Sequence, residues 1–531
     1  MPGELRGDIT RDTYSPQKQF LRVLMQQGRV QVDADFNEQV SILLNYLQTL
    51  ATDLIGPYGV PAMAPGFEIG LQTDSPSNGL SNLTIGPGRY YLEGLLCENL
   101  PVSENGAPIT FEKQPYFSPP AKANHPYPDL PFLVYLDVWE QHIDPVQDGG
   151  SHGPSIREVA LGGPDTAARS KVIWQVRHTQ KLTPNSNDDL QEIFNSVVPA
   201  PVQNPPDGGV PAPGEPNGQP GEEEASTSDS QLAELVKAVA EHLRTQPQTG
   251  QTLLHRLIGH TDNAVPRLRA RAARNSTSTP HDPCTVAPDA RYRGAENQLY
   301  RVEIHTGSDN GANPTFKWSR ENSAVVFPLA SAPGQVVTLE HLGYDSRFSL
   351  KEGDWVEVID DAYIYRNEPK PLLQVKKIDL ITLQVTLSAP PEGATGSDRS
   401  LHPALRRWDH QAGNSGLGGS VLASDGTIPI AEDDRWQTLE NGVQVQFLLG
   451  TYRPGDYWLI PARTATGDVE WPQTRQDGKY EPQALPPHGV KHYYAPLALI
   501  AKDENGDIQA VDCRRQFAPL PPAPADPDPE V

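Results

Sequence analysis

The chain has 531 residues, a formal net charge of −24 and three cysteines. This length predicts several domains rather than one core. The acidic balance excludes nucleic-acid binding as the main role, because a phosphate backbone would be repelled. Cys97, Cys284 and Cys513 lie far apart and none belongs to a CxxC pair. A disulfide framework and a cysteine-built zinc site are therefore excluded.

The sequence also lacks the usual signals for membrane insertion or export. No stretch approaches the roughly 20 apolar residues that a membrane helix needs. The first six residues, MPGELR, lack the apolar core of a signal peptide. We therefore expect a soluble protein without a transmembrane segment, cytoplasmic when made.

Two helices are predicted at the N-terminus. Ser15-Pro16 provides a capping hydroxyl and a first-turn proline for a helix that Gly28 ends. A second helix is expected from Asp35, with Glu38 completing a capping box, to Gly56-Pro57.

The second helix carries apolar residues at heptad spacing, a pattern typical of a seam that packs against another helix. One candidate partner is the first helix folding back as a hairpin; the other is a helix from a different subunit. In either case these side chains are the predicted packing or docking seam: Phe36, Val40, Leu43, Leu47, Leu50 and Leu54.

After Pro57 the apolar period changes from helical to alternating, which indicates strands. A Gly86-Pro87-Gly88 turn separates the first strands, and Asn441-Gly442 signals a hairpin turn. The clearest strand segments are residues 83–85, 89–97, 132–139, 171–176, 298–304, 315–318, 324–327, 336–339, 354–360, 373–375, 383–387, 443–447, 455–460 and 495–501.

An acidic segment interrupts this pattern. Residues 184–230 contain no Lys or Arg and are rich in Pro and Gly, so they are expected to form a loop rather than a packed unit. Residues 231–245 follow with helical apolar spacing. The fold class is thus mainly β, with an N-terminal α-helical hairpin and several small β-sandwich or barrel-like modules.

The pattern of helices, strands and composition predicts six parts of the chain. The expected units are a helical hairpin (1–60), a β domain (61–183), an acidic insertion with a short helix (184–285), a β-barrel or sandwich module (286–400), a C-terminal β module (401–518) and a disordered tail (519–531).

No signature of catalysis, metal binding or cofactor binding emerges. The chain lacks GxxxxGK[ST] and GxGxxG motifs. Asp33 to Glu38 imitates the start of a calcium loop, but Glu38 stands where glycine is needed. His488 and His492 are four apart in a segment that does not look helical. We therefore expect that the protein is not an enzyme and binds no metal and no cofactor.

Tryptophans on strands offer a different class of function. Trp458 and Trp471 could form a surface-aromatic site that stacks on sugars, although strand tryptophans more often fill a core. A carbohydrate- or surface-binding fibre-like module is therefore the alternative function, and a glycan hydrolase is a third.

Several blocks of sequence resemble an uncharacterised bacterial family associated with phage-tail-like contractile injection systems. The blocks are GDITRDTY (7–14), VLMQQGRVQVDADFNEQ (23–39), REVALGGPDT (157–166), YRVEIH (300–305), FKWSREN (316–322) and GDYWLIPAR (455–463). The resemblance implies a baseplate-associated structural protein that acts as a scaffold through protein–protein contacts. It implies baseplate, spike, sheath or tube proteins as partners, and many copies in a symmetric particle.

Overall fold

The computed structural model shows a mainly β protein with several separate sheets, as the sequence predicts. The structure describes residues 5–74, 79–100, 106–117, 127–148, 155–161, 166–182, 229–258, 265–273, 292–308, 313–343, 347–393, 395–413, 420–431, 435–476 and 479–518. The predicted acidic loop, apart from its last two residues, and the C-terminal tail lie outside these residues.

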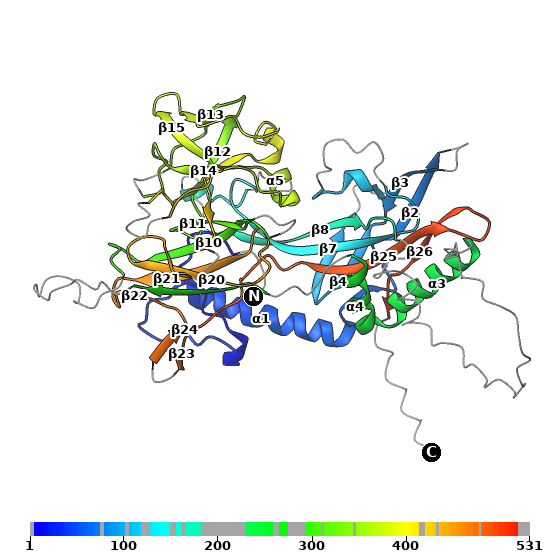
Figure 1. Cartoon of the computed structure of the whole chain (residues 1–531). Helices are drawn as coiled ribbons and strands as arrows, with labels where there is room; N and C mark the ends of the chain where they lie inside the picture. Colours follow the sequence, from blue (N-terminus) through cyan, green and yellow to red (C-terminus); the bar gives the residue numbers. More distant parts are fainter. Residues whose placement is uncertain are drawn as a thin grey trace, which may run out of the picture.

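A four-stranded antiparallel sheet organises one half of the molecule (Figure 1). Its strands, in the order β26-β25-β7-β8, are β26 (Ile508–Asp512), β25 (Tyr493–Lys502), β7 (Phe132–Ile143) and β8 (Arg169–His178). Alternate residues of β7 belong to two different hydrophobic cores. Val134 and Leu136 lie in one core, and Leu133 lies in the other. Both faces of this sheet are therefore buried.

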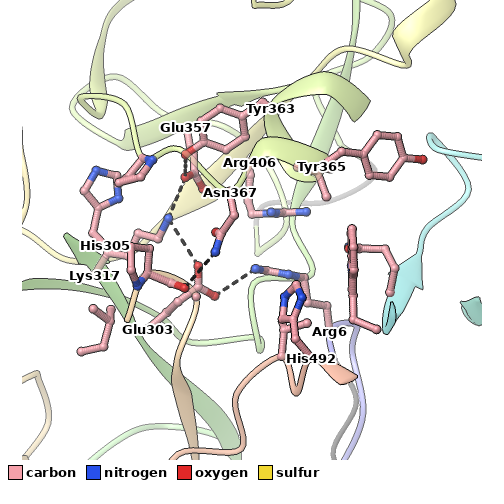
Figure 2. A pocket seen from close by; sticks show the side chains of 18 of the residues that line it. Arg6, Glu303, His305, Lys317, Glu357, Tyr363, Tyr365, Asn367, Arg406 and His492 are labelled. Atoms are coloured by element: carbon pink, nitrogen blue, oxygen red, sulfur yellow. Dashed lines mark hydrogen bonds and ion pairs between the residues drawn. The ribbon is translucent and has the colours of Figure 1, made fainter. Parts of the chain in front are cut away.

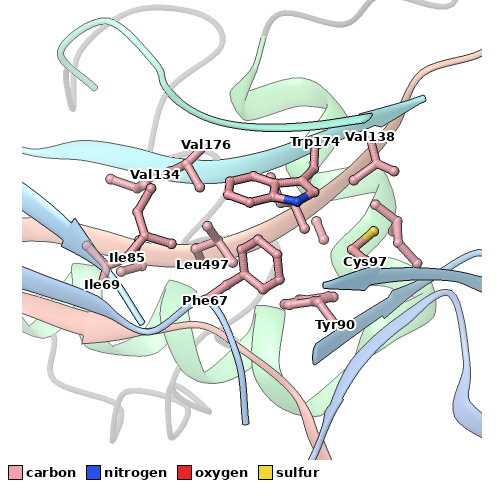
Figure 3. Close-up of a cluster of buried hydrophobic side chains, with 14 of the residues drawn as sticks. Phe67, Ile69, Ile85, Tyr90, Cys97, Val134, Val138, Trp174, Val176 and Leu497 are labelled. Atoms are coloured by element: carbon pink, nitrogen blue, oxygen red, sulfur yellow. The ribbon is translucent and has the colours of Figure 1, made fainter. Parts of the chain in front are cut away.

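Two smaller sheets cover the first face. One is formed by β27 (Gln516–Phe517), β1 (Tyr58–Pro61), β4 (Gly88–Leu92) and β5 (Leu95–Asn99), the other by β2 (Ile69–Asp74), β3 (Gly79–Ile85) and β6 (Ile109–Thr110). Figure 3 shows the shared core, in which the Phe67 ring packs edge-on against Trp174 with centroids 4.9 Å apart. Glu93 and Gly94, both with positive φ, turn the expected 89–97 strand into the β4–β5 hairpin.

Helices α3 (Asp229–Thr245) and α4 (Pro247–Leu257) cover the second face. The apolar spacing of residues 231–245 predicted α3, and that prediction is confirmed. Val236, Val239 and Leu243 pack on Leu133 and Leu499 of the sheet.

The other half contains a sandwich and a barrel. The sandwich packs β18 (Ile428–Pro429), β11 (Thr315–Ser319), β10 (Gln298–Thr306), β21 (Tyr457–Arg463) and β22 (Asp468–Val469) against β19 (Gln437–Thr438), β20 (Val443–Leu448) and β9 (Arg267–Ala272). The Asn441-Gly442 turn joins β19 to β20, as expected. A separate hairpin pairs β23 (Gln473–Gln476) with β24 (Lys479–Pro482).

The closed barrel has its own core and confirms the expected barrel-like module. Helix α5 (Asp361–Arg366) follows strand β14 (Trp355–Ile359) and is capped by the Asp360 carboxylate. The strands, in barrel order, are β12 (Val326–Ser331), β13 (Val336–Leu339), β16 (Gln384–Leu387), β15 (Leu373–Asp379), β14 (Trp355–Ile359) and β17 (Ala404–Trp408).

Strand pairing crosses the linear division that the sequence indicated. β25 pairs with β7 and β27 pairs in parallel with β1, so the end of the 401–518 segment completes the sheets of the 61–183 segment. β21 likewise joins β10 in the sandwich.

The expected N-terminal helical hairpin is wrong. Only the 3-10 turn η1 (Pro16–Lys18) forms, and residues 19–32 are not helical. Gln19 adopts a left-handed conformation (φ 55°) and its N–H bonds back to Pro16, which ends the turn. A short helix here would have gained little packing, and isolated helices of this length are marginal.

The second predicted helix does form, as α1 (Asp33–Ile55). It begins two residues earlier than expected and without the Asp35–Glu38 capping box. Asp33 instead accepts a 2.8 Å hydrogen bond from the Thr10 N–H, and Glu38 accepts one of 2.7 Å from the Thr13 hydroxyl. These bonds hold residues 10–13 beside the start of the helix.

Candidate functional site

The predicted seam lies on the surface of the protein. Its six side chains are between 37% and 67% exposed, whereas Ala34 and Ile42 are the buried side chains of α1. Figure 1 shows α1 running along the outside of the molecule, from the sandwich toward α4. Among the described residues, no helix packs against this seam in the way that the hairpin prediction required.

Few contacts attach α1 to the body of the protein. Gly94, at the β4–β5 turn, approaches the backbone of Gln48 so closely that a Cβ there would collide with it. Arg515 donates to the Ile55 carbonyl at the C-terminal end of the helix. These contacts fix the helix while leaving its heptad face uncovered.

Other apolar side chains on α1 and in the segment before it are exposed as well. Leu44 and Tyr46 on α1 are exposed, and so are Leu21, Leu24 and Val30 in the preceding segment. We call these five residues together with the six seam residues the N-terminal apolar surface. Exposed apolar patches of this kind mark interaction sites in folded proteins.

The charges of α1 all have one sign. Asp33, Asp35, Glu38 and Asp53 lie on the helix, and residues 33–55 contain no Lys or Arg. Three of these carboxylates lie near the start of the helix and one near its end, and carboxylates attract cationic groups.

The predicted surface-aromatic site at Trp458 and Trp471 is wrong. Trp458 is 1% exposed and Trp471 is 8% exposed, and both belong to the sandwich core. Their indole N–H groups donate to the carbonyls of Leu485 and Gln483, so the rings are fixed inside the protein. Neither ring can stack on a sugar.

A polar cavity of about 90 Å³ forms a second candidate site (Figure 2). It lies where the four-stranded sheet, the sandwich and the barrel meet. Each of these parts contributes side chains to the cavity wall. Trp139 and Arg177 come from the four-stranded sheet, and Glu303, His305 and Lys317 come from the sandwich. The barrel and α5 contribute Glu357, Arg406 and Tyr363, and the N-terminal segment contributes Arg6.

A buried network of charges forms one wall of this cavity. Lys317 Nζ lies 2.6 Å from Glu357 Oε1 and 3.4 Å from Glu303 Oε1. Arg6 and Arg301 contact the other oxygen of Glu303 at 3.0 and 2.6 Å. Figure 2 shows Arg6 and Lys317 reaching Glu303 from different sides.

These cations keep the carboxylates ionised. Burial alone would raise the pKa of Glu357, but the neighbouring cations, Lys317 first, lower it to about 2. Arg6, Arg301 and Lys317 likewise overcome the effect of burial and hold the pKa of Glu303 well below its usual range. Burial, followed by Lys317, lowers the pKa of His305 to about 4, so its ring is neutral at pH 7.

Sequence reasoning missed this cavity, although the strand blocks contained a signal. In the ladders, Glu303 stands directly opposite Lys317, and Glu357 directly opposite Arg406. Charged residues at alternating strand positions indicate a solvent-facing side, and no local pattern shows that another module covers that side.

Four of the six blocks that carry the resemblance lie at or beside this cavity. YRVEIH is part of β10, FKWSREN begins in β11, and GDYWLIPAR contains β21, so all three lie in one sheet. The first block follows Arg6 directly, and Asn322 donates to the Gly7 carbonyl at 3.1 Å.

Two further features are absent from the described part of the chain. No group of three or more His, Cys, Asp or Glu residues is arranged to hold a metal ion. In the same residues, no helix combines the length and apolarity needed to cross a membrane.

Comparison with known proteins gives a family without an assigned activity. None of the curated proteins matches the chain. A solved structure titled "Crystal structure of TssK" aligns over 81% of this chain and 99% of that one, with 8% identity and a TM-score of 0.16, which is too low to carry an argument. Residues 5–520 match a family described as a family of unknown function (DUF6519), and the chain belongs to that family.

Proposed function

We propose that the protein is a structural subunit of a phage-tail-like contractile injection system, associated with the baseplate, and that it acts through protein–protein contacts rather than catalysis. The observation that carries this proposal is the exposed heptad face of α1. The resemblance of the six sequence blocks supports the choice of machine.

The geometry of the face specifies its occupant. A heptad repeat packs knobs into the holes of another helix, whereas sheets present no such spacing. Covering each half-exposed Leu or Phe side chain would contribute about 1 kcal/mol, so the six seam residues together are worth about 6 kcal/mol before the cost of association. A helix of the partner is therefore the occupant that gains most.

The negative charge of α1 limits which partner helices can bind to it. α1 carries four carboxylates and no cation, and the whole chain is strongly acidic. A second copy of α1 would bring like charges together, which costs free energy. The occupant is therefore an apolar helix flanked by Lys or Arg, supplied by a different subunit of the particle.

The test combines Leu43→Asp with Leu47→Asp. Placing two carboxylates in the centre of the seam leaves them buried and unpaired in the complex, so incorporation into purified particles should fall at least about tenfold. Incorporation is measured by quantitative mass spectrometry of the particles.

A matched control uses Leu449→Asp with Ile381→Asp. These side chains are 95% and 93% exposed and belong to the turns after β20 and β15 rather than to α1, so this variant should assemble normally. Normal assembly of a folded L43D/L47D variant would contradict the docking role. Self-association of the purified chain that is lost in L43D/L47D would instead identify a second copy as the occupant.

A further inference from the structure

The segment before α1 is exposed along almost its whole length. In residues 16–32, every side chain is exposed except that of Val23, which is half-buried. In Figure 1 this segment is drawn in dark blue at the edge of the molecule, beside the start of α1. Four of its large apolar side chains are each at least 55% exposed: Phe20, Leu21, Leu24 and Met25. Exposed apolar clusters of this kind mark interaction sites.

The spacing of these four residues fits a short helix. Positions one and four residues apart share one face of an α-helix. Residues 20–27, which lie between the left-handed Gln19 and Gly28, are long enough for about two turns. The turns do not form in the single chain, because so short a helix is marginal without a surface to pack on. A partner that supplies this surface offsets the cost of ordering the segment.

The segment and α1 carry opposite charges. Residues 15–32 contain Lys18, Arg22 and Arg29 but no Asp or Glu, whereas α1 contains carboxylates and no cation. None of these three cations forms an ion pair with a described carboxylate. Two copies of α1 repel each other, but the segment of one copy and α1 of another attract. The segment therefore combines the two properties that the seam requires of its partner, an apolar helical face and flanking cations.

Hydrogen bonds keep the segment of the same chain away from the seam. Besides the bonds of residues 10–13 to the start of α1, the Gln39 side chain accepts a 2.8 Å hydrogen bond from the Val23 N–H. With these bonds in place, the seam and the apolar residues of the segment are both exposed. Both surfaces are therefore available to another copy of the chain.

We propose that residues 20–27 of a neighbouring copy dock as a short helix on the first half of the α1 seam. This inference rests on the docking role of α1 proposed above and identifies the partner. The first half of the seam lies closest to the three carboxylates at the start of α1, which attract the cations of the segment. The seam residues that the segment covers are Phe36, Val40, Leu43 and Leu47.

The docked segment leaves part of the seam uncovered. Two helical turns are about 12 Å long, whereas the seam from Phe36 to Leu54 is about 27 Å long. Leu50 and Leu54 therefore stay available to a different protein of the particle. Because every copy carries both the segment and the seam, the contact closes as a two-fold dimer or repeats around a ring.

Sedimentation equilibrium of the full-length protein tests the proposal. A buffer of about 0.15 M ionic strength screens the general repulsion between acidic chains. The unchanged protein should self-associate. Leu21→Asp with Leu24→Asp disrupts the segment, and Leu43→Asp with Leu47→Asp disrupts the seam. Each double variant should lower the association constant at least about tenfold, because it places carboxylates in an apolar contact.

A mixture of the two defective variants separates this contact from other pairings. L21D/L24D keeps an intact seam and L43D/L47D keeps an intact segment, so the mixture should associate although neither variant does so alone. Mixing would not restore a contact between two seams or between two segments. Leu449→Asp with Ile381→Asp is the control, because it adds the same two charges elsewhere and should associate as the unchanged protein does.

Hydrogen exchange of residues 20–27 provides a second measurement. Their amides should be protected in the associated protein and exchange rapidly in L43D/L47D, and circular dichroism verifies that each variant is folded. The inference is overturned if the unchanged protein stays monomeric, or if the mixture of folded variants does not associate. A monomeric unchanged protein whose L43D/L47D variant still fails to enter particles would overturn this inference alone and leave the docking role of α1 intact.

Discussion

Glu357 illustrates how a buried charge depends on its neighbours. Its carboxylate accepts from Lys317 at 2.6 Å, from the Tyr363 hydroxyl at 2.6 Å and from the Trp408 indole at 3.1 Å. With these partners the ionised form is satisfied even though it is buried. Removing the charge leaves Lys317 with the more distant Glu303 alone.

Glu357→Gln should therefore lower the stability of the protein by about 3–5 kcal/mol at neutral pH, because it breaks a buried ion pair from one side. Urea unfolding followed by intrinsic fluorescence measures the change. The control is Glu504→Gln, which breaks the exposed pair with Lys237 and should cost less than about 1 kcal/mol. Equal effects of the two substitutions would contradict the importance of the buried network.

The same carboxylate predicts a dependence on pH. A pKa lowered in the folded state stabilises the protein above the ordinary Glu value of about 4.3, and that stability is lost as the pH falls toward 2. Between pH 5 and pH 2 the unchanged protein should lose more stability than Glu357→Gln. Urea midpoints measured across this range provide the check, and parallel curves would show that Glu357 makes no such contribution.

Sequence reasoning could predict the strands that hold these residues but not their burial. In β10, Tyr300, Val302 and Ile304 alternate into the sandwich core, as their spacing indicates. Arg301 and Glu303 occupy the opposite face, which polar residues normally leave to solvent. The N-terminal segment and the barrel cover that face, and neither is adjacent in sequence.

At the scale of elements, α1 shows which features of a helix can be predicted from neighbouring residues alone. Its apolar period and its end at Gly56 follow from nearby residues and are confirmed. The helix predicted before α1, which would have covered its apolar face, does not form. Gln19 adopts a left-handed conformation and ends the turn after Lys18. A helix can therefore be predicted correctly from sequence while the surface that its apolar face packs against is not.

The attachment of α1 can be tested at the β4–β5 turn. Gly94→Ala should release the helix, because the new methyl group collides with the backbone of Gln48 in addition to the strain of φ +76°. Hydrogen exchange of the α1 amides, followed by mass spectrometry, should become at least about tenfold faster. Gly506→Ala is the control: its φ is +86° but nothing lies within 4 Å, so α1 should exchange normally. Unchanged exchange in Gly94→Ala would show that this contact does not hold the helix.

At the scale of the whole molecule, the sheets differ in how far apart their strands lie in the sequence. The barrel closes with strands from residues 326–408 alone and has its own core. The four-stranded sheet needs β7 and β25, which are separated by hundreds of residues. The order of strands along the chain therefore does not show which segments contain every strand of their own sheet.

This difference predicts how fragments behave. Residues 324–409 expressed alone should unfold cooperatively on heating, because every barrel strand is present. Residues 58–182 alone should show no cooperative transition, because their core lacks Leu497 and Ile500 of β25. Calorimetry compares the two fragments; a cooperative transition of fragment 58–182 would show that β25 is not needed.

The pairing of β7 with β25 also matters during synthesis. After β8 leaves the ribosome, roughly 300 residues must still be translated before β25 arrives, which takes about 15–60 s at ordinary elongation rates. During that interval, the edge of β7 that will receive β25 stays unpaired and open to aggregation. We therefore expect newly made chains to be most prone to aggregation until β25 has been translated.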